Sequence, residues 1–159
     1  YIELFVEMDA DFSHDPRELK EKIDFFKKHE LDMLIASRYT KNSKILNWSI
    51  FRRSFSLLSN FLAKLLLKIP CTDYTNGFRF YSRRAAETVV NKCGKIGDGF
   101  IVLSEILVEI HSNNYKIDEL STIFVNRERG HSSVNLKLIV SSLFGLIKLY
   151  YLKKQKHKI

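Results

Sequence analysis

The pattern of hydrophobic and polar residues predicts that strands and helices alternate in the first part of the chain. An aromatic and branched run at 1–6 predicts a buried strand, and the apolar run at 31–37 predicts a second one. Between them, Asp-Pro-Arg-Glu at 15–18 is typical of a helix start, and apolar residues follow it at helical spacing. Because short links join these elements, we expect a parallel βαβ unit in an α/β domain.

The rest of the chain predicts longer helices and shorter strands. A polar, loop-like stretch at 40–47 comes first, and Pro70 ends an amphipathic helix at 50–69. The remaining expected elements are a short strand at 78–81 after an Asn-Gly turn, helices at 82–90 and 100–113, two short strands within 115–125, and an apolar helix at 136–152 that is broken by two lysines.

Two of these helices have apolar faces with basic borders. The helix at 50–69 either packs in the core or lies on a membrane surface. The helix at 136–152 runs into a polybasic tail at 153–158, which is typical of an interfacial membrane anchor, although it could also begin a spanning segment. We therefore expect a folded domain at 1–135 and a membrane-interfacial C-terminal helix at 136–159.

Composition narrows the class of protein. The 159 residues are 45% hydrophobic, which suits one globular domain with a core. A net charge of +8 indicates an anionic partner, such as nucleic acid, nucleotide phosphates or an anionic membrane. Cys71 and Cys93 form neither a disulfide framework nor a metal-binding spacing, so we expect free thiols in a reducing compartment. Because the chain begins inside a predicted strand, we expect that an N-terminal part is missing.

The candidate chemistry starts at Asp9 and Asp11, which follow the first predicted strand. Alternate side chains of a strand share a face, so the two carboxylates project together at the strand end where α/β sheets bind ligands. Oxygen ligands of this kind suit Mg²⁺ or Mn²⁺, with bound phosphates completing the shell. The alternative is a solvated turn without a metal.

Arginines supply candidate contacts for an anion. Arg38 follows the second predicted strand and should lie on the same sheet edge as Asp11, either as a surface residue or as a phosphate clamp. Arg127, Arg129 and Ser132 belong to a polar loop that contains a glycine, and this loop suits a phosphate site or a salt-bridged surface turn equally well.

One family resemblance concerns the aspartates alone. Asp9 to Ser13 resembles the opening motif of the haloacid-dehalogenase-type phosphatases, in which the first aspartate becomes phosphorylated. That family carries further acidic residues after a later strand, and Gly97 to Gly99 is a poor match for them. We keep this resemblance as a minor alternative.

A second resemblance extends over nearly the whole chain. Its motifs are E-M-D-A-D-F-S-H-D-P at 7–16, A-S-R-Y at 36–39, N-W at 47–48, R-R at 52–53, D-Y-T-N-G-F-R at 73–79 and F-V-N-R-E-R-G at 124–130. Together they resemble the dolichyl-phosphate mannosyltransferase group of the family-2 inverting glycosyltransferases. The resemblance implies a GT-A-type, Rossmann-like mixed sheet flanked by helices, and a preceding nucleotide-binding half that we expect to be missing here.

The resemblance also implies roles for the residues that match its motifs. Asp9, Asp11 and Ser13 would contact the metal and the donor phosphates, and Asp11, Arg38 and Arg127 would form the catalytic group. The groups expected around the acceptor phosphate are Arg52, Arg53, Arg127, Arg129 and Ser132. On this acceptor side the chain departs from the pattern, because Ser133 stands where the family has lysine and Ile101 where it has glutamine or glutamate.

The implied reaction moves a sugar, typically mannose from GDP-mannose, to a polyprenyl phosphate at the cytoplasmic face of a membrane. Since the acceptor phosphate is already anionic, the protein needs no base; it aligns an in-line displacement and stabilises the leaving diphosphate. An anionic lipid explains the basic surplus and the amphipathic helices better than nucleic acid does. Alternatives are another sugar, such as glucose, and a basic polyanion-binding module. Polysaccharide elongation of the Q-x-x-R-W type is excluded within this stretch, because its only Gln and Trp are Gln155 and Trp48.

Overall fold

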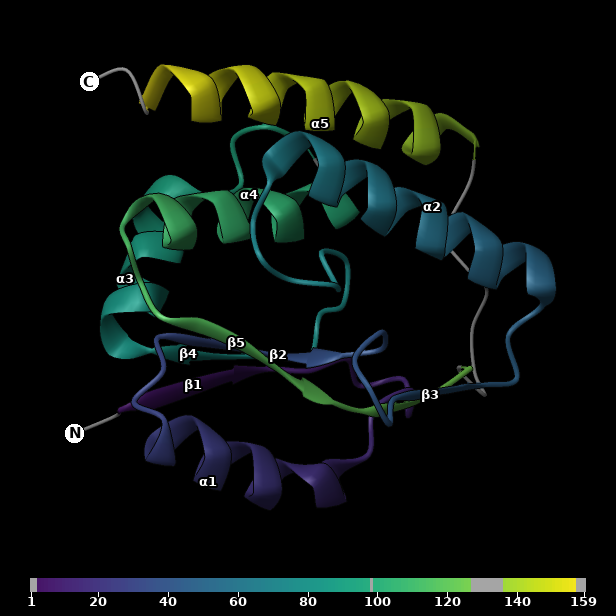
Figure 1. The fold of residues 1–159 in the computed structure, drawn as a ribbon, viewed down its shortest axis with the longest axis vertical. Helices are drawn as coiled ribbons and strands as arrows, with labels where there is room; N and C mark the ends of the chain where they lie inside the picture. The colour runs from purple at the N-terminus through teal and green to yellow at the C-terminus, as the bar shows by residue number, and fades with distance from the viewer. Residues whose placement is uncertain (1–2, 98, 127–135, 157–159) are drawn as a thin grey trace.

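The structure is a mixed β-sheet with helices on both faces. This computed structural model describes residues 3–97, 99–126 and 136–156. The helices are, in chain order, α1 (Leu19–Lys28), α2 (Ile50–Leu67), α3 (Arg83–Lys92), α4 (Phe100–Ser112) and α5 (Leu136–Lys156). In Figure 1, α1 covers one face of the sheet, α3 and α4 cover the other, and α5 lies on the far side of α4, next to α2. The predicted α/β class, with a mixed sheet flanked by helices, is confirmed.

The main sheet has an inserted antiparallel strand. Its strands are β1 (Leu4–Glu7), β2 (Met33–Ser37), β4 (Arg79–Ser82) and β5 (Ile117–Ser121), in the order β1-β4-β2-β5. β4 is antiparallel to both of its neighbours, whereas β2 and β5 are parallel. β1 and β2 therefore run in the same direction, as the expected βαβ unit requires. They are not adjacent, however, because β4 lies between them and pairs with both.

The first two strands differ in burial. All five residues of β2 are buried, because β4 and β5 flank it and a hydrophobic cluster covers each of its faces. β1 forms an edge of the sheet, and Phe5 and Val6 are each 41% exposed. The prediction of a buried first strand is therefore wrong for the described residues. Aromatic and branched residues favour a strand, but they do not say whether a second strand covers it.

The helix start at 15–18 forms as predicted. The Asp15 side chain accepts a hydrogen bond of 2.9 Å from the Arg17 backbone N–H in a 3₁₀ turn, η1 (Pro16–Glu18), which leads into α1. The Glu18 carboxylate accepts hydrogen bonds from Thr122 Oγ1 at 2.6 Å and from the Ile123 backbone N–H at 3.0 Å. Glu18 therefore ties the start of α1 to the end of β5.

A second, smaller sheet replaces part of a predicted loop. β3 (Lys44–Leu46) pairs in parallel with β6 (Ile123–Val125), with Ile45 opposite Phe124. The expectation of a loop throughout 40–47 is therefore wrong at β3. The local sequence is polar, and the partner strand that orders it comes much later in the chain. β5 and β6 confirm the two short strands expected within 115–125.

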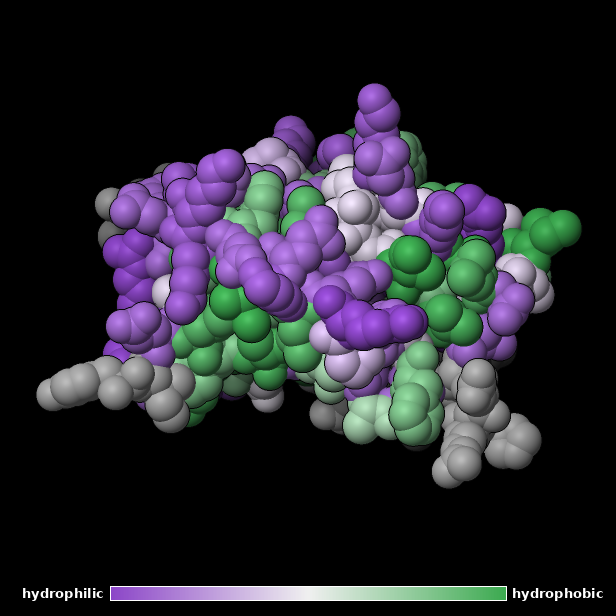
Figure 2. Space-filling model, turned by 90° about the horizontal axis from the view of Figure 1, so that it is seen from below, coloured by the Kyte–Doolittle hydropathy of each residue, from purple (hydrophilic) through white to green (hydrophobic). Residues whose placement is uncertain are grey.

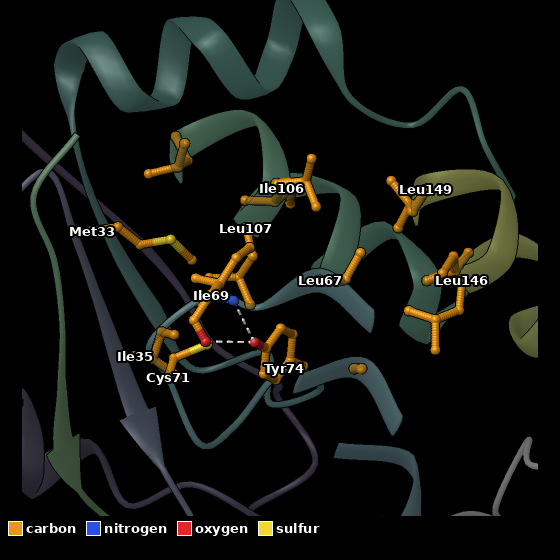
Figure 3. Close-up of a cluster of buried hydrophobic side chains, with 14 of the residues drawn as sticks. Met33, Ile35, Leu67, Ile69, Cys71, Tyr74, Ile106, Leu107, Leu146 and Leu149 are labelled. Atoms are coloured by element: carbon orange, nitrogen blue, oxygen red, sulfur yellow. Dashed lines mark hydrogen bonds between the residues drawn. The ribbon is translucent and has the colours of Figure 1, made fainter. Parts of the chain in front are cut away.

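Alternate residues of β2 point into two separate cores. Leu34 and Ala36 belong to the cluster that faces α1, whereas Met33 and Ile35 belong to the larger cluster below α4. Figure 3 shows this larger cluster, in which side chains from the sheet, α2, α4 and α5 meet. Within it, the Tyr74 hydroxyl donates to the Ile69 carbonyl oxygen at 2.7 Å, so its polar group is satisfied.

Helix α5 contributes to this core. Leu146 and Leu149 are 6% and 1% exposed and lie in the same cluster as the α4 side chains. A Cβ atom built at Gly145 would lie 2.6 Å from Ile101 Cγ1, so glycine is what allows α5 to approach α4 this closely. The C-terminal helix expected to begin near 136 therefore packs against the domain that precedes it.

Candidate active site

A cavity of about 850 Å³ opens between the sheet and the outer helices. The ends of β1 and β2 and the turn before β4 contribute polar groups to its lining, including Asp9, Arg38 and Asn76. Helices α2, α4 and α5 contribute mainly apolar side chains, including Phe55, Leu58, Leu62, Phe100, Val102, Leu143 and Leu146. The two walls therefore differ in chemistry: one suits an anionic group and the other suits an apolar chain.

Asp9 lies on the polar wall. Its side chain is 58% exposed, and its Oδ2 atom lies 3.6 Å from His14 Nε2. Opposite it lies Gly77, where an added Cβ atom would be 3.6 Å from Asp9 Oδ1. The absence of a side chain at Gly77 therefore leaves space beside the carboxylate.

Asp11 lies in a tight turn next to Asp9. Its Oδ1 atom accepts hydrogen bonds from the Ser13 backbone N–H at 3.1 Å and from the Ser13 hydroxyl at 2.5 Å, and Phe12 between them has a left-handed φ of 63°. Ser13 itself is buried, and its backbone carbonyl oxygen accepts from the Val125 N–H at 3.0 Å. The turn alternative is thus present at Asp11, which, unlike Asp9, is not among the residues that line the cavity, and the metal role of the two aspartates stays a prediction.

The donor set of this segment suits a hard divalent cation. Asp9 and Asp11 offer carboxylate oxygens, the type of ligand that Mg²⁺ and Mn²⁺ take, and Mg²⁺ commonly uses one or two carboxylates together with phosphate oxygens and water. Within the described residues, no cluster of three or more His, Cys, Asp or Glu side chains forms a metal site made of protein alone. A cation bound by Asp9 and Asp11 would therefore need further oxygens from a bound phosphate or from water.

Arg38 lines the cavity but is held by Asp73. The Arg38 guanidinium donates to both Asp73 oxygens, at 2.8 and 2.7 Å, and to Thr75 Oγ1 at 2.7 Å. Burial by itself would raise the pKa of Asp73, but the adjacent guanidinium charge lowers that pKa below its ordinary value. Because the pair is almost neutral as a whole, Arg38 brings less net positive charge to the cavity than its predicted role as a phosphate clamp assumes.

The turn at 72–77 is supported from two sides. The Glu119 carboxylate, in the middle of β5, accepts from the backbone N–H groups of Thr72 at 2.7 Å and Asp73 at 2.9 Å. Arg79, which is fully buried, donates to the carbonyl oxygens of Asn76 at 2.8 Å and Leu103 at 2.7 Å. The sequence predicts an Asn-Gly turn here and a motif of family resemblance, D-Y-T-N-G-F-R, and these hydrogen bonds show how the turn is held so that Gly77 lies opposite Asp9.

Of the two adjacent arginines in α2, Arg52 is the one that lines the cavity. Its guanidinium lies 4.3 Å from the centre of the Trp48 ring and donates to Asn126 Oδ1 at 2.6 Å. Arg53 is exposed and does not belong to the lining. Trp48 was expected only as part of a motif, and the structure places its ring beneath Arg52 on the cavity wall.

The remaining predicted acceptor residues, Arg127, Arg129 and Ser132, lie outside the described residues, as does Ser133. Asn126 precedes them directly and contacts Arg52. Their roles stay predictions.

Cys71 and Cys93 form no disulfide within the part of the chain that the structure describes. Cys71 is buried, and its burial raises the pKa of its thiol to about 12. Since the thiolate is the nucleophilic form, Cys71 is an inert core residue at neutral pH.

Comparisons with known proteins match this chain to a family and to two relatives. Residues 3–90 match the family described as "Glycosyl transferase family 2". The chain is 29% identical over 141 residues to the "Polyprenol monophosphomannose synthase" of Mycolicibacterium smegmatis, covering 89% of this chain and 52% of that protein. It is 28% identical over 134 residues to the "Undecaprenyl-phosphate mannosyltransferase" of Micrococcus luteus, covering 84% of this chain and 54% of that protein. The chain thus spans about half the length of the curated relatives that it matches.

Proposed function

Because the chain belongs to glycosyl transferase family 2, we propose that it is part of an inverting glycosyltransferase that moves mannose from GDP-mannose to a polyprenyl phosphate. The names of its two relatives support mannose as the sugar and a polyprenyl phosphate as the acceptor. The family match over more than half of the chain also argues against the phosphatase alternative.

The observation that carries this proposal is the mixed chemistry of the cavity. Asp9 lies on its polar wall, Arg52 adds a cationic group from α2, and apolar side chains of α2, α4 and α5 line the rest. A polyprenyl phosphate has the same division, with an anionic head and a long apolar chain. We propose that the phosphate lies near Arg52 and that the first isoprene units lie against α2 and α5.

The reaction needs alignment more than proton transfer. In the proposed step, an acceptor phosphate oxygen forms a bond to the anomeric carbon while the bond from that carbon to the nucleotide diphosphate breaks, with inversion. Mg²⁺ or Mn²⁺, held by Asp9 and Asp11 with Ser13 nearby, would supply charge neutralisation for the leaving diphosphate. Arg52, Arg127, Arg129 and Ser132 would hold the acceptor phosphate, with Arg53 outside the cavity. Asp11, Arg38 and Arg127 would order the reacting groups.

We also propose that the outer helices rest on the cytoplasmic surface of a membrane. Apolar side chains are exposed along α2 and α5, including Phe51 at 81%, Phe61 at 61% and Phe144 at 69%. The opposite face of the molecule, seen from the side of α1 in Figure 2, carries many hydrophilic side chains. Among the described helices, none combines the length and the apolar character needed to cross a bilayer.

Sugar transfer by the complete protein tests the proposed function. We expect label from GDP-mannose to appear on a long polyprenyl phosphate but not on the corresponding alcohol, and we expect the product to have the inverted anomeric configuration by NMR. UDP-glucose in place of GDP-mannose tests the alternative sugar. Asp9→Asn should remove transfer, whereas Asp24→Asn, an exposed aspartate of α1 paired with Lys20, is a matched control. Equal transfer by wild type and Asp9→Asn would overturn the proposal for this site.

A further inference from the structure

His14 is buried next to the proposed site without a hydrogen-bond partner. The residue is 3% exposed, and neither ring nitrogen has a partner within the described part of the chain. Its backbone is fixed from one side, because the carbonyl oxygen of the preceding Ser13 accepts from Val125 in β6. A neutral imidazole carries one N–H donor and one acceptor nitrogen, and leaving both unsatisfied in the interior costs free energy.

The surroundings of His14 hold its ring in one orientation. The centre of the Phe78 ring lies 5.0 Å away at a tilt of 49°, and that of the Phe124 ring lies 5.1 Å away almost edge-on, at 82°. These two rings come from either side of the site, Phe78 from the turn before β4 and Phe124 from β6. The imidazole is thus clamped, and its Nε2 atom points towards Asp9 Oδ2 at 3.6 Å.

Of the two partners, the aspartate is the one with room to move. The Asp9 side chain is 58% exposed, whereas that of His14 is fully buried. A small change in the Asp9 side-chain rotamer would shorten 3.6 Å to hydrogen-bond distance. The other oxygen, Oδ1, is the one nearer to Gly77 and remains available for a ligand.

We infer that His14 is a positioning residue for Asp9: its Nε2–H donates to Asp9 Oδ2 and holds the carboxylate with Oδ1 directed at the cation and donor diphosphate. This inference rests on the proposed function, in which Asp9 is a ligand of that cation. Side chains that orient a metal ligand in this way commonly change metal affinity by about ten- to one-hundred-fold when they are replaced. The alternative is that His14 is only an aromatic spacer between Phe78 and Phe124.

Two substitutions separate these roles. His14→Phe keeps an aromatic ring between Phe78 and Phe124 but removes the donor. His14→Gln removes the ring but carries an amide N–H donor that reaches about as far as Nε2 does. A spacer role predicts that His14→Phe behaves like wild type, whereas a positioning role predicts that His14→Gln does.

The test measures how much Mn²⁺ the complete protein needs to bind GDP, by calorimetry at a series of Mn²⁺ concentrations. We expect His14→Phe to raise the half-saturating Mn²⁺ concentration roughly ten- to one-hundred-fold, and His14→Gln to stay within a few-fold of wild type. His29→Gln, in a histidine that stacks on Phe25 at the end of α1, is the matched control and should change nothing.

Asp9→Asn in the same titration separates the inference from the function on which it rests. If Asp9→Asn needs no more Mn²⁺ than wild type, the proposed metal role of Asp9 fails. If Asp9→Asn loses Mn²⁺-dependent GDP binding while His14→Phe titrates like wild type, the metal role stands and the positioning role is overturned.

A spectroscopic readout covers the case in which His14→Phe is unstable. In the metal-free complete protein, ¹⁵N-edited NMR of the imidazole should show His14 as the Nε2–H tautomer, with an Nε2 proton signal that shifts in Asp9→Ala. An Nδ1–H tautomer, or a signal that is identical in Asp9→Ala, would overturn the inference.

Discussion

Arg38 and Asp73 form a buried ion pair that joins the end of β2 to the turn before β4. The Asp73 carboxylate accepts from the Arg38 backbone N–H at 3.0 Å as well as from its guanidinium, and the Arg38 and Asp73 side chains are 6% and 0% exposed. The pair thus fixes the position of the turn that carries Gly77, and through it one wall of the cavity.

The first prediction concerns the stability that this pair provides. Asp73→Asn leaves the buried Arg38 charge without its counter-ion, and removal of one partner of such a pair commonly costs about 3–5 kcal/mol. We expect a loss of this size in the free energy of unfolding, measured with urea in the complete protein. Asp24→Asn is the matched control, since its partner Lys20 is exposed; an equal effect of the two substitutions would show that the Arg38–Asp73 pair is not structural.

The second prediction gives the pH dependence of the same pair. The pKa of Asp73 is lowered in the folded state, so its contribution is complete above the unfolded value of about 3.9 and is lost as the pH falls through the folded pKa. The pKa of Arg38 is raised, so its contribution is complete through neutral and moderately alkaline pH and is lost only in strong alkali. The stability difference between wild type and Asp73→Asn should therefore be constant near neutral pH and should shrink in acid below about pH 4. A difference that changes between pH 6 and 8 would require another titrating group.

The third prediction contrasts two glycines. An added Cβ atom at Gly77 would make only ordinary contacts, the nearest 3.6 Å from Asp9 Oδ1, so Gly77→Ala should fold normally but occupy space beside the carboxylate. Gly94 has open space around it but a φ of 80°, so Gly94→Ala should cost about 1 kcal/mol in stability. We expect Gly77→Ala to raise the KM for the sugar donor at an unchanged Tm, and Gly94→Ala to lower Tm at an unchanged KM. If Gly77→Ala instead lowered Tm at an unchanged KM, the sugar donor would lie away from Gly77.

The fourth prediction concerns the arginines of the acceptor side. Arg52 lies on the cavity wall and Arg53 outside it, so Arg52→Ala should raise the KM for polyprenyl phosphate several-fold more than Arg53→Ala does. Arg127→Ala and Arg129→Ala should likewise weaken use of the lipid phosphate far more than they lower Tm. If the activity of these variants falls only in step with the amount of folded protein, the arginines are structural and do not contact the phosphate.

Local sequence patterns predicted most of the secondary structure, and long-range pairing explains the errors. The helix starts at Asp15 and Ser82 follow from capping chemistry within a few residues, and both caps form. The strand Lys44–Leu46 carries no such local signal, because it is ordered by pairing with Ile123–Val125. The insertion of β4 between β1 and β2 likewise depends on the register of three separate segments.

Some residues of the candidate site could likewise be predicted from local sequence, and others depend on long-range contacts. Asp9 could be found from two aspartates after an apolar run, since that pattern has its own chemistry. The hydrogen bonds that support the turn at 72–77 could not be found, because Glu119 reaches Thr72 across 47 positions and Arg79 reaches Leu103 across 24. His14 follows the D-x-D motif in the sequence without a signal of its own. Only the positions of the Phe78 and Phe124 rings show that its imidazole points towards Asp9.

The last prediction concerns the membrane, and it follows from the division of α5 into two faces. Leu149 is 1% exposed and belongs to the core, so deletion of the whole helix would expose apolar surface and confuse unfolding with loss of membrane binding. Phe144 and Ile147 are 69% and 48% exposed on the same helix and can be changed without opening the core. Basic side chains beside them, such as Lys148, should each add about 1 kcal/mol of attraction near anionic lipid.

We therefore expect Phe144→Ser with Ile147→Ser to reduce sedimentation of the complete protein with anionic liposomes, at an unchanged Tm. Transfer to a long polyprenyl phosphate should fall more than transfer to a short, water-soluble one. The reason is that a long isoprenoid stays in the bilayer, where each buried CH₂ contributes about 0.8 kcal/mol, and the enzyme must come to it. Leu149→Ala is the contrasting control: it should lower stability by about 2–5 kcal/mol and affect both acceptors equally. If the double variant binds liposomes and uses both acceptors as wild type does, the exposed face of α5 does not contact the membrane.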